Sequence, residues 1–193
     1  MRILCIGDSN TYGYDLRSCF GGRYPAEIRW TDRLNGVINS GLNGLSVPAD
    51  AADFIDLIRR TTPDWVTVML GVNDLLLGAS ADVTASRMEA FLTKLKGALA
   101  QIEVQTRILL IAPPPVQRGE WVTSDRIIGE SKKLGTLYRE LAHKTEVYFT
   151  DAGAWNVELT FDGVHFSEAG HAAFAIGLAK AFNETAGRPL TSN

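Results

Sequence analysis

Serine, histidine and aspartate occur in this sequence in an arrangement that could perform acyl transfer. Ser9 follows a short apolar run and Gly7, which predicts a tight turn that presents the hydroxyl group. His165 comes three residues after Asp162, in a predicted turn that also holds Gly163. This spacing lets the carboxylate reach Nδ1 of the imidazole and leaves Nε2 free to accept a proton from the serine. The three residues therefore offer a nucleophile, a base and a group that orients the base.

The other two histidines are weaker candidates for the base. His143 lies in a charged stretch at a predicted helix end, which favours a solvated side chain. His171 falls on the same predicted helix face as Phe174, which favours a packing or capping role. Asp162 also has a purely structural interpretation, because an Asp-Gly pair often forms a turn. Its combination with Ser9 favours the catalytic interpretation.

Acyl transfer also requires hydrogen-bond donors for the negative charge that develops on the carbonyl oxygen. Asn73 follows a predicted buried strand and offers a side-chain amide. Gly44 lies in a segment rich in Gly and Asn and can present a backbone N–H with no side chain in the way. The same segment could instead be a turn that needs a positive φ. The sequence leaves both interpretations of Gly44 open.

Alternating strand and helix patterns must position these residues. Continuous apolar runs, typical of strands buried on both faces, cover residues 2–6, 65–70, 107–111 and 147–149. Helical periodicity covers residues 51–60, 82–102 and 127–144, and a further helix follows Ser167, its predicted N-cap. The alternation predicts a three-layer α/β fold around a parallel sheet, in a single domain that spans residues 1–193. Because ligands bind at the carboxyl ends of such strands, we expect Ser9, Asn73 and His165 to converge on one edge.

The composition of the 193 residues argues against several other classes of protein. Hydrophobic residues make up 46% and charged residues 21%, as in ordinary globular domains rather than disordered chains. The net charge of −3 provides no basic surface for a nucleic-acid partner. No apolar run is long enough to span a membrane or to serve as a secretion signal, so we expect a cytoplasmic protein without a membrane partner. Cys5 is predicted to be a core residue and Cys19 a free thiol, with no Cys/His cluster for zinc.

Acidic residues near the candidate triad allow a metal-based alternative. Asp8 and Asp74 are predicted to be buried structural acids that hold loops. Together with Asp162 and His165 they could also belong to a metal-dependent phosphoesterase. Such sites usually need a denser set of His and Asp ligands, so the serine interpretation is favoured.

Four segments of the sequence resemble, in order, the motif blocks of the SGNH (GDSL) hydrolase family. They are Gly7-Asp8-Ser9, Gly44, Gly71-Val72-Asn73-Asp74 and Asp162-Gly163-Val164-His165. The resemblance implies a flavodoxin-like α/β/α sandwich and a serine esterase that hydrolyses small carboxylic esters through an acyl-enzyme. It implies Ser9 as nucleophile, His165 as base and Asp162 as the residue that orients the base. The oxyanion donors would be the Ser9 and Gly44 N–H groups and the Asn73 side chain, and no metal or organic cofactor is implied.

Within this family the sequence is most similar to the bacterial arylesterase/acyltransferase branch, in residues 2–5, 29–31, 112–115 and 151–153. Multimers of that branch use longer insertions than this chain has, so a homo-oligomer is left open. Two departures stand out. Asn10 stands where the GDSL pattern has leucine, and the short spacing between Leu34 and Val37 predicts a short or distorted second strand.

The substrate site is predicted from residues next to the motifs. Asn10, Tyr12 and Trp121 are candidate lining residues, and Tyr14 is a further aromatic residue on the same rim. Residues 117–120 make the loop 116–124 mostly polar, which predicts a shallow site for short acyl groups, from acetate to about butyrate. Trp30 is predicted to be part of the core.

Three other functions remain as alternatives. The chain could remove acetyl groups from O-acetylated carbohydrates, and less strongly it could be a lysophospholipase or thioesterase. It could also be a non-catalytic binding module. Against the binding module, every triad and oxyanion position carries the residue type that catalysis needs.

Overall fold

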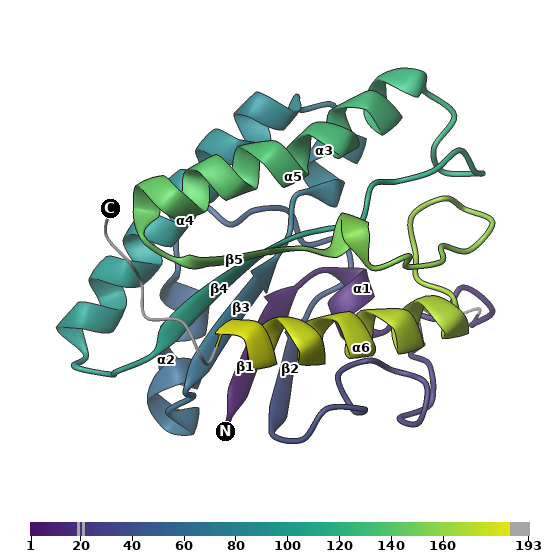
Figure 1. The fold of residues 1–193 in the computed structure, drawn as a ribbon. Helices are drawn as coiled ribbons and strands as arrows, with labels where there is room; N and C mark the ends of the chain where they lie inside the picture. The colour runs from purple at the N-terminus through teal and green to yellow at the C-terminus, as the bar shows by residue number, and fades with distance from the viewer. Residues whose placement is uncertain (19, 21, 186–193) are drawn as a thin grey trace.

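A five-stranded parallel sheet forms the centre of the computed structural model, which describes residues 1–18, 20 and 22–185 (Figure 1). Its strands are β1 (Ile3–Gly7), β2 (Val37–Gly41), β3 (Trp65–Met69), β4 (Arg107–Ala112) and β5 (Tyr148–Asp151). They lie in the order β2-β1-β3-β4-β5, which is the flavodoxin-like order. The predicted fold class is therefore confirmed, and the four apolar runs correspond to β1, β3, β4 and β5 with ends within two residues.

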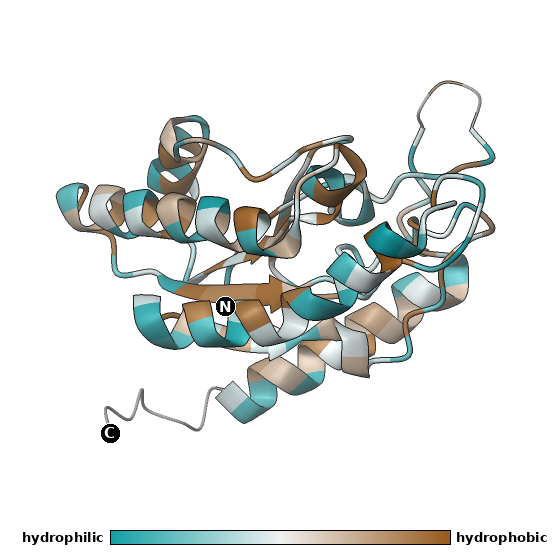
Figure 2. Ribbon diagram, turned by 90° about the horizontal axis from the view of Figure 1, so that it is seen from above, coloured by the Kyte–Doolittle hydropathy of each residue, from teal (hydrophilic) through white to brown (hydrophobic). Residues whose placement is uncertain are grey.

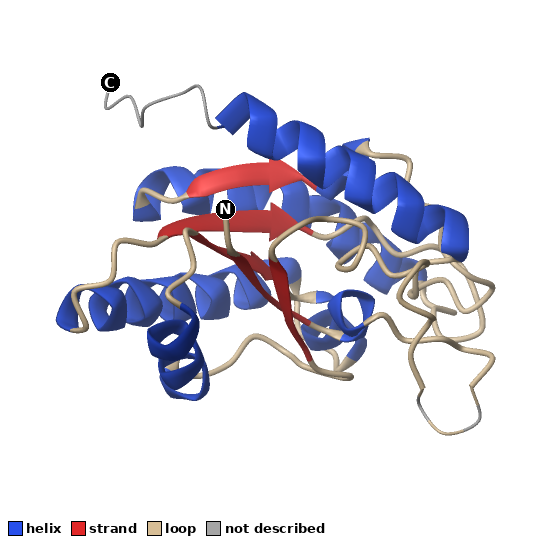
Figure 3. Cartoon of the chain, turned by 90° about the horizontal axis from the view of Figure 1, so that it is seen from below, coloured by secondary structure: helices blue, strands red, loops and turns tan. Residues whose placement is uncertain are grey.

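Helices cover both faces of the sheet (Figure 3). They are α1 (Ser9–Tyr12), α2 (Ala52–Thr61), α3 (Val72–Leu76), α4 (Ala81–Gln101), α5 (Asp125–Thr145) and α6 (Glu168–Thr185), with a short 3-10 helix η1 (Ala152–Ala154). The predicted helices correspond to α2, α4, α5 and α6. Ser167 caps α6 as predicted, because its Oγ accepts the N–H of Gly170 at 3.0 Å. The short helices α1 and α3 have too few residues to show a periodic pattern.

Successive strand residues point into two separate hydrophobic layers. Leu4 and Ile6 of β1 pack with side chains of α2, α4 and α5. Ile3 and Cys5 pack on the other face with side chains of α6. Figure 2 shows the apolar sheet between these helix layers. All residues of β1 are buried, as the continuous apolar pattern predicted, and burial raises the pKa of the Cys5 thiol to about 12.

The core also tests the prediction that Trp30 is buried. Trp30 is buried as predicted, although it lies in a segment of turns rather than in a helix. Trp65, the first residue of β3, is also buried. The prediction of a free thiol at Cys19 lies outside the described residues.

No helix in the described part of the chain combines the length and apolarity needed to cross a bilayer.

The second strand is neither short nor distorted, and this prediction was wrong. β2 has five residues and pairs with β1 in an uninterrupted parallel register, from Ile3 opposite Val37 to Gly7 opposite Gly41. Turns lead directly into the strand at residue 36, whose carbonyl accepts the N–H of Ile3 at 2.9 Å. The short spacing after Leu34 therefore removes a regular helix before the strand and leaves the strand itself intact.

Gly41 is the place where β2 approaches α1 most closely, and its substitution tests this packing. A Cβ atom at Gly41 would lie 2.1 Å from the backbone nitrogen of Tyr12. We expect Gly41→Ala to lower the free energy of unfolding by about 1–3 kcal/mol, because the backbone of α1 must shift. Urea unfolding would measure the change.

Gly97→Ala is the matched control. Gly97 lies exposed in α4, and a Cβ there would meet nothing within 4 Å. This variant should gain up to about 1 kcal/mol from the better helix propensity of alanine. A Gly41→Ala protein as stable as the wild type would contradict the close approach of β2 and α1.

Candidate active site

The segments that follow the carboxyl ends of the strands lie along one edge of the sheet (Figure 1), and these segments carry the candidate residues. Ser9 follows β1 as the first residue of α1, and Asn73 follows β3 in α3. His165 lies in the loop between η1 and α6. The strand order reverses direction between β1 and β3, which is where ligands bind in open parallel sheets. The edge predicted from the sequence is thus the edge at which these residues meet.

Ser9, His165 and Asp162 form a continuous hydrogen-bonded chain. The Ser9 Oγ lies 2.9 Å from Nε2 of His165. The Nδ1 of His165 lies 2.5 Å from Oδ2 of Asp162. All three residues are nearly inaccessible to solvent, with exposed fractions of 6% for Ser9, 3% for His165 and 0% for Asp162. The arrangement meets the geometric requirement for a hydroxyl, a base and an orienting carboxylate.

The turn from Thr160 to His165 holds the Asp162 carboxylate ionised. Burial raises the pKa of this carboxyl, but hydrogen bonds from His165, from the Val164 N–H and from the Thr160 hydroxyl outweigh burial and bring it well below its usual range. Gly163 makes the turn with φ of +82°, and a Cβ there would lie 2.1 Å from the carbonyl oxygen of Gln117. Asp162 is therefore a fixed negative charge that is hydrogen-bonded to Nδ1 of His165.

Asp8 and Asp74 hold loops around the triad, as predicted. Asp8 caps α1 by accepting the N–H of Asn10 at 3.0 Å. Burial raises the pKa of Asp8 from its ordinary value of 3.8 to about 6, although the Asn10 N–H and the nearby His165 partly offset it. Asp74 is fully buried, accepts the N–H of Val47 at 2.9 Å and pairs with Arg87 at 2.7 Å.

Three hydrogen-bond donors surround the space next to Ser9. Within the described residues, the backbone N–H groups of Ser9 and Gly44 have no hydrogen-bond partner. Gly44 adopts φ of +75°, so the turn and the donor interpretations of this glycine are compatible. The Asn73 amide donates one proton to the Leu45 carbonyl at 3.1 Å, which leaves its second N–H available. Gly44 and Asn73 line the same cavity as Ser9.

This cavity of about 230 Å³ opens over Ser9 and His165 and has a mainly apolar wall. The wall is formed by Tyr14, Leu76, Trp121 and Val164. The sequence pointed to the two aromatic residues but not to Leu76 or Val164. Leu76 lies three residues after Asn73, and Val164 stands inside the Asp162–His165 motif, so position relative to the motifs was the only available signal.

Two aromatic rings flank the imidazole of His165. The Tyr14 ring lies 4.7 Å and the Trp121 ring 5.0 Å from it, centroid to centroid. Trp121 is held by its backbone N–H, which donates to the Asp162 carbonyl at 3.1 Å. The ring of Trp121 therefore forms the wall, and the polar residues 117–120 that were expected to line the site do not.

Two predicted lining residues lie elsewhere, and the structure corrects these assignments. The Asn10 side chain is buried and bonds to the backbone of Val164 and Phe166. Tyr12 packs under the guanidinium of Arg23, 4.6 Å from its ring centroid. Neither side chain lines the cavity, because the helical turn of α1 directs consecutive residues to different sides.

The remaining histidines have the structural roles that the sequence predicted. His143 is exposed near the end of α5. His171 is buried between the rings of Tyr24 and Phe166. Burial, followed by the charges of Arg33 and Arg29, lowers the pKa of His171 to about 4.

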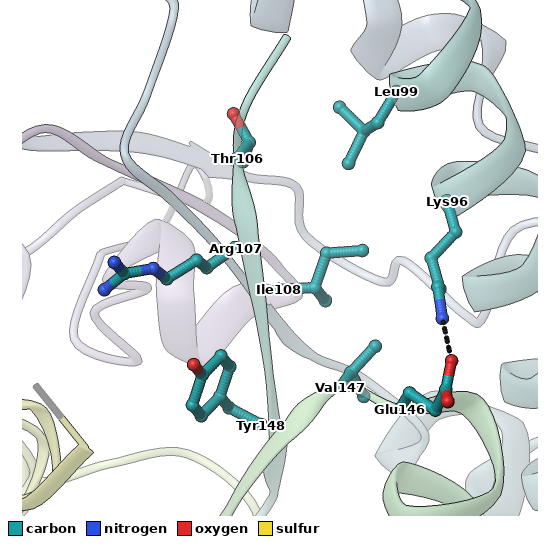
Figure 4. A pocket seen from close by; sticks show the side chains of 8 residues that line it. All are labelled: Lys96, Leu99, Thr106, Arg107, Ile108, Glu146, Val147 and Tyr148. Atoms are coloured by element: carbon teal, nitrogen blue, oxygen red, sulfur yellow. Dashed lines mark ion pairs between the residues drawn. The ribbon is translucent and has the colours of Figure 1, made fainter. Parts of the chain in front are cut away.

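A second cavity lies at the opposite edge of the sheet, where β4 and β5 begin (Figure 4). It measures about 340 Å³ and includes Arg107, Tyr148 and an ion pair between Lys96 and Glu146 at 3.6 Å. It holds no serine, cysteine or histidine that could act as nucleophile or base. In the described part of the chain, no cluster of three or more His, Cys, Asp or Glu side chains is arranged to hold a metal ion.

Comparison with known proteins agrees with this geometry. The sequence matches the GDSL-like lipase/acylhydrolase family over residues 5–173. The chain belongs to this family. The resemblance seen in the sequence is thereby confirmed, and membership identifies the protein as a carboxylic ester hydrolase of the SGNH type.

Proteins to which the chain is similar include esterases of two kinds. The chain is 25% identical over 153 residues to an acetylxylan esterase from Geobacillus stearothermophilus. The aligned region covers 72% of this chain and 68% of that protein. An aryl esterase from M. smegmatis is 25% identical with a TM-score of 0.82, covering 95% of this chain and 98% of the other. A carbohydrate acetylesterase from Sinorhizobium meliloti is 27% identical with a TM-score of 0.78, covering 96% and 99%.

The raised pKa of Asp8 predicts how the stability of this hydrolase depends on pH. As the pH falls through the ordinary value of 3.8 the carboxyl becomes protonated in both folded and unfolded chains, whereas above about pH 6 it is a buried anion that opposes folding. We expect Asp8→Asn to match the wild type near pH 4 and to exceed its free energy of unfolding at pH 8 by at most about 3 kcal/mol. Asparagine keeps the cap of α1.

Urea unfolding of both proteins at several pH values would measure this difference. Asp50→Asn is a control, because Asp50 is an exposed acid that accepts the N–H of Ala52 near the start of α2. A constant difference between Asp8→Asn and the wild type from pH 4 to pH 8 would contradict the raised pKa.

Proposed function

We propose that this protein hydrolyses small carboxylic esters through an acyl-enzyme formed on Ser9. The observation that carries the proposal is the buried hydrogen-bonded chain from the Ser9 hydroxyl through His165 to Asp162. The apolar cavity above it supports a small uncharged ester as the substrate. In this assignment Ser9 is the nucleophile, His165 is the general base and Asp162 orients the imidazole.

Each step of the reaction uses a group at the site. The Ser9 oxygen attacks the ester carbonyl carbon while its proton moves to Nε2 of His165. The carbonyl oxygen becomes an anion that accepts hydrogen bonds from the Ser9 and Gly44 N–H groups and from Asn73. The bond to the alcohol oxygen then breaks, and His165 returns the proton to the leaving alcohol. Water, deprotonated by His165, attacks the acyl-enzyme, and its proton is returned to Ser9 as the acid leaves.

The size of the cavity favours a short acyl group. Its volume of about 230 Å³ is below the roughly 300–1,000 Å³ of pockets for drug-sized ligands. Acetyl to butyryl esters of a small alcohol suit such a space, and longer chains would extend into solvent. The proposal of short chains thus rests on volume, because the wall of Tyr14, Leu76 and Trp121 is not polar.

Deacetylation of a carbohydrate is the second candidate function. Relatives of the chain include an acetylxylan esterase and a carbohydrate acetylesterase. Trp121 also favours this activity, because the residue borders the cavity and remains 52% exposed. An exposed aromatic face can hold the apolar face of a sugar ring as well as an aryl group.

Replacement of the triad residues tests the proposed function. We expect Ser9→Ala and His165→Ala each to reduce ester hydrolysis by about 10⁴-fold or more, because triad members act as a unit. Asp162→Asn should be comparable or milder. Hydrolysis of 4-nitrophenyl acetate measures the rates, and circular dichroism checks that the variants fold.

Two controls separate the proposed chemistry from its alternatives. His143→Ala should leave turnover unchanged, because His143 is exposed and lies outside the cavity. A serine-reactive phosphonate should inactivate the wild type, whereas a chelator should leave it active. Inactivation by the chelator would instead indicate a metal-dependent phosphoesterase. Full activity of Ser9→Ala would refute the nucleophile, and an inactive wild type would favour a binding module.

Substitution of Trp121 tests the alcohol side of the site. We expect Trp121→Ala to raise KM for phenyl acetate and for an acetylated xyloside by about 3–30-fold, and KM for ethyl acetate by much less. Phe161→Ala is the control, because Phe161 is an exposed aromatic residue that does not line the cavity. Whichever of the aryl and sugar esters has the higher wild-type kcat/KM identifies the favoured alcohol. Equal KM changes for ethyl acetate would contradict a ring-stacking role.

Acyl-chain length can be measured in the same assay. The wild type should lose kcat/KM from butyrate to octanoate esters in micelle-free solution. A steady rise through octanoate would instead favour a lysophospholipase or thioesterase. A cytoplasmic location stays a prediction from the sequence, and the question of a homo-oligomer stays open.

A further inference from the structure

Asn10, the residue after the proposed nucleophile, connects the Ser9 turn to the segment that carries His165. Its Nδ2 donates to the carbonyl of Val164 at 3.1 Å. Its Oδ1 accepts the N–H of Phe166 at 2.9 Å. These two backbone groups flank His165 on either side in the chain, although Asn10 lies more than 150 residues away. The side-chain amide thus pairs with the His165 segment as a neighbouring strand would.

Asn10 is itself held firmly in place. Its side chain is buried, with an exposed fraction of 5% for the residue. Its N–H donates to Asp8 Oδ1 at 3.0 Å, and its carbonyl accepts the indole N–H of Trp30 at 2.8 Å. Every polar group of Asn10 named here therefore has a defined partner, and its amide can transmit the position of α1 to His165.

The catalytic cycle makes this connection important. Within the described residues, the other hydrogen bond between α1 and the segment 162–166 is the Ser9–His165 bond itself. That bond must break when His165 turns its proton toward the leaving alcohol. The two Asn10 bonds do not take part in proton transfer and persist through the cycle. These two bonds can keep Nε2 of His165 within reach of both the Ser9 oxygen and the oxygen of the leaving alcohol.

We propose that Asn10 is a positioning residue that fixes His165 relative to Ser9 through its two bonds to the backbone of Val164 and Phe166. The inference rests on the proposed function, because it assigns a role within the Ser9–His165 pair. The amide is required for both bonds. Leucine, which has a similar shape, would leave a buried carbonyl and a buried N–H without partners. Aspartate would keep an acceptor for Phe166 and lose the donor to Val164.

Isosteric substitution at the buried amide of Asn10 and at the half-buried amide of Asn39 provides the test. We expect Asn10→Leu to lower kcat for 4-nitrophenyl acetate by about 10–100-fold with less than about a threefold change in KM, since a shift of about 1 Å can cost about 100-fold. Asn10→Asp should lower kcat by a smaller factor, at least about threefold.

Asn39→Leu is the matched control, with kcat expected within about threefold of the wild type. Asn39 also binds α1 through a side-chain amide, donating to the Thr11 carbonyl at 2.8 Å and to the Thr31 hydroxyl at 3.0 Å. It therefore supports α1 in a comparable way but makes no bond to the His165 segment in the described structure.

A double substitution separates positioning of His165 from general damage to the fold. In a His165→Ala background, Asn10→Leu should change the residual rate by less than about threefold, because its target is already absent. An equal loss in both backgrounds would show that Asn10 acts on something else, such as the Ser9 N–H, and would overturn the proposal. A kcat equal to that of the wild type in Asn10→Leu or in Asn10→Asp would also overturn the proposal.

The remaining outcomes also decide the question. If Asn10→Leu does not fold, Asn10→Asp carries the test, and failure of both to fold beside a folded Asn39→Leu would assign Asn10 to stability instead. An active Ser9→Ala protein would overturn the proposed function and this role with it. An inactive Ser9→Ala with unchanged Asn10 variants would overturn the Asn10 role alone.

Discussion

The hydrogen bond between the Ser9 hydroxyl and Nε2 of His165 joins residues that are 156 positions apart in the chain. Its length of 2.9 Å depends on two separate supports. Ser9 is set by the end of β1 and by the Asp8 cap of α1, whereas His165 is set by the turn around Asp162. Because the parallel sheet places the carboxyl ends of all strands on one edge, both supports lie on the same rigid base. A small shift of either loop would separate the Ser9 hydroxyl from the imidazole of His165.

Two buried aspartates at this site have opposite electrostatic properties. Asp162 receives hydrogen bonds from a hydroxyl, two backbone N–H groups and the imidazole, so its pKa is low despite burial. Asp8 receives fewer hydrogen bonds and burial dominates, so its pKa is raised to about 6. The number of donors that reach each carboxylate explains the difference. The site thus contains one carboxylate that is built to be an anion and one whose charge weakens the fold.

The sheet edge and the loops supply different parts of the cavity lining. The sheet edge supplies Ser9, Gly44 and Asn73, which line one side of the cavity with hydrogen-bonding groups. The loop between β4 and α5 supplies Trp121, which borders the cavity and remains partly exposed. Relatives that act on aryl esters and on acetylated carbohydrates share this fold. Loop residues such as Trp121 are therefore the natural place for differences in substrate preference.

The sequence by itself determined the fold class, the limits of four strands and three helices to within two residues, the start of a fourth helix after Ser167, and the residues of the triad as candidates. These features depend on local patterns, namely continuous apolar runs, helical periodicity and the short Asp162-to-His165 spacing. Tertiary structure decided what local patterns cannot express. It placed Asn10 against the His165 segment and not in the cavity, because the direction of a side chain in a four-residue helix depends on the packing of that helix. It made β2 a regular strand, because pairing with β1 supplied the hydrogen bonds that the short spacing before Val37 could not indicate.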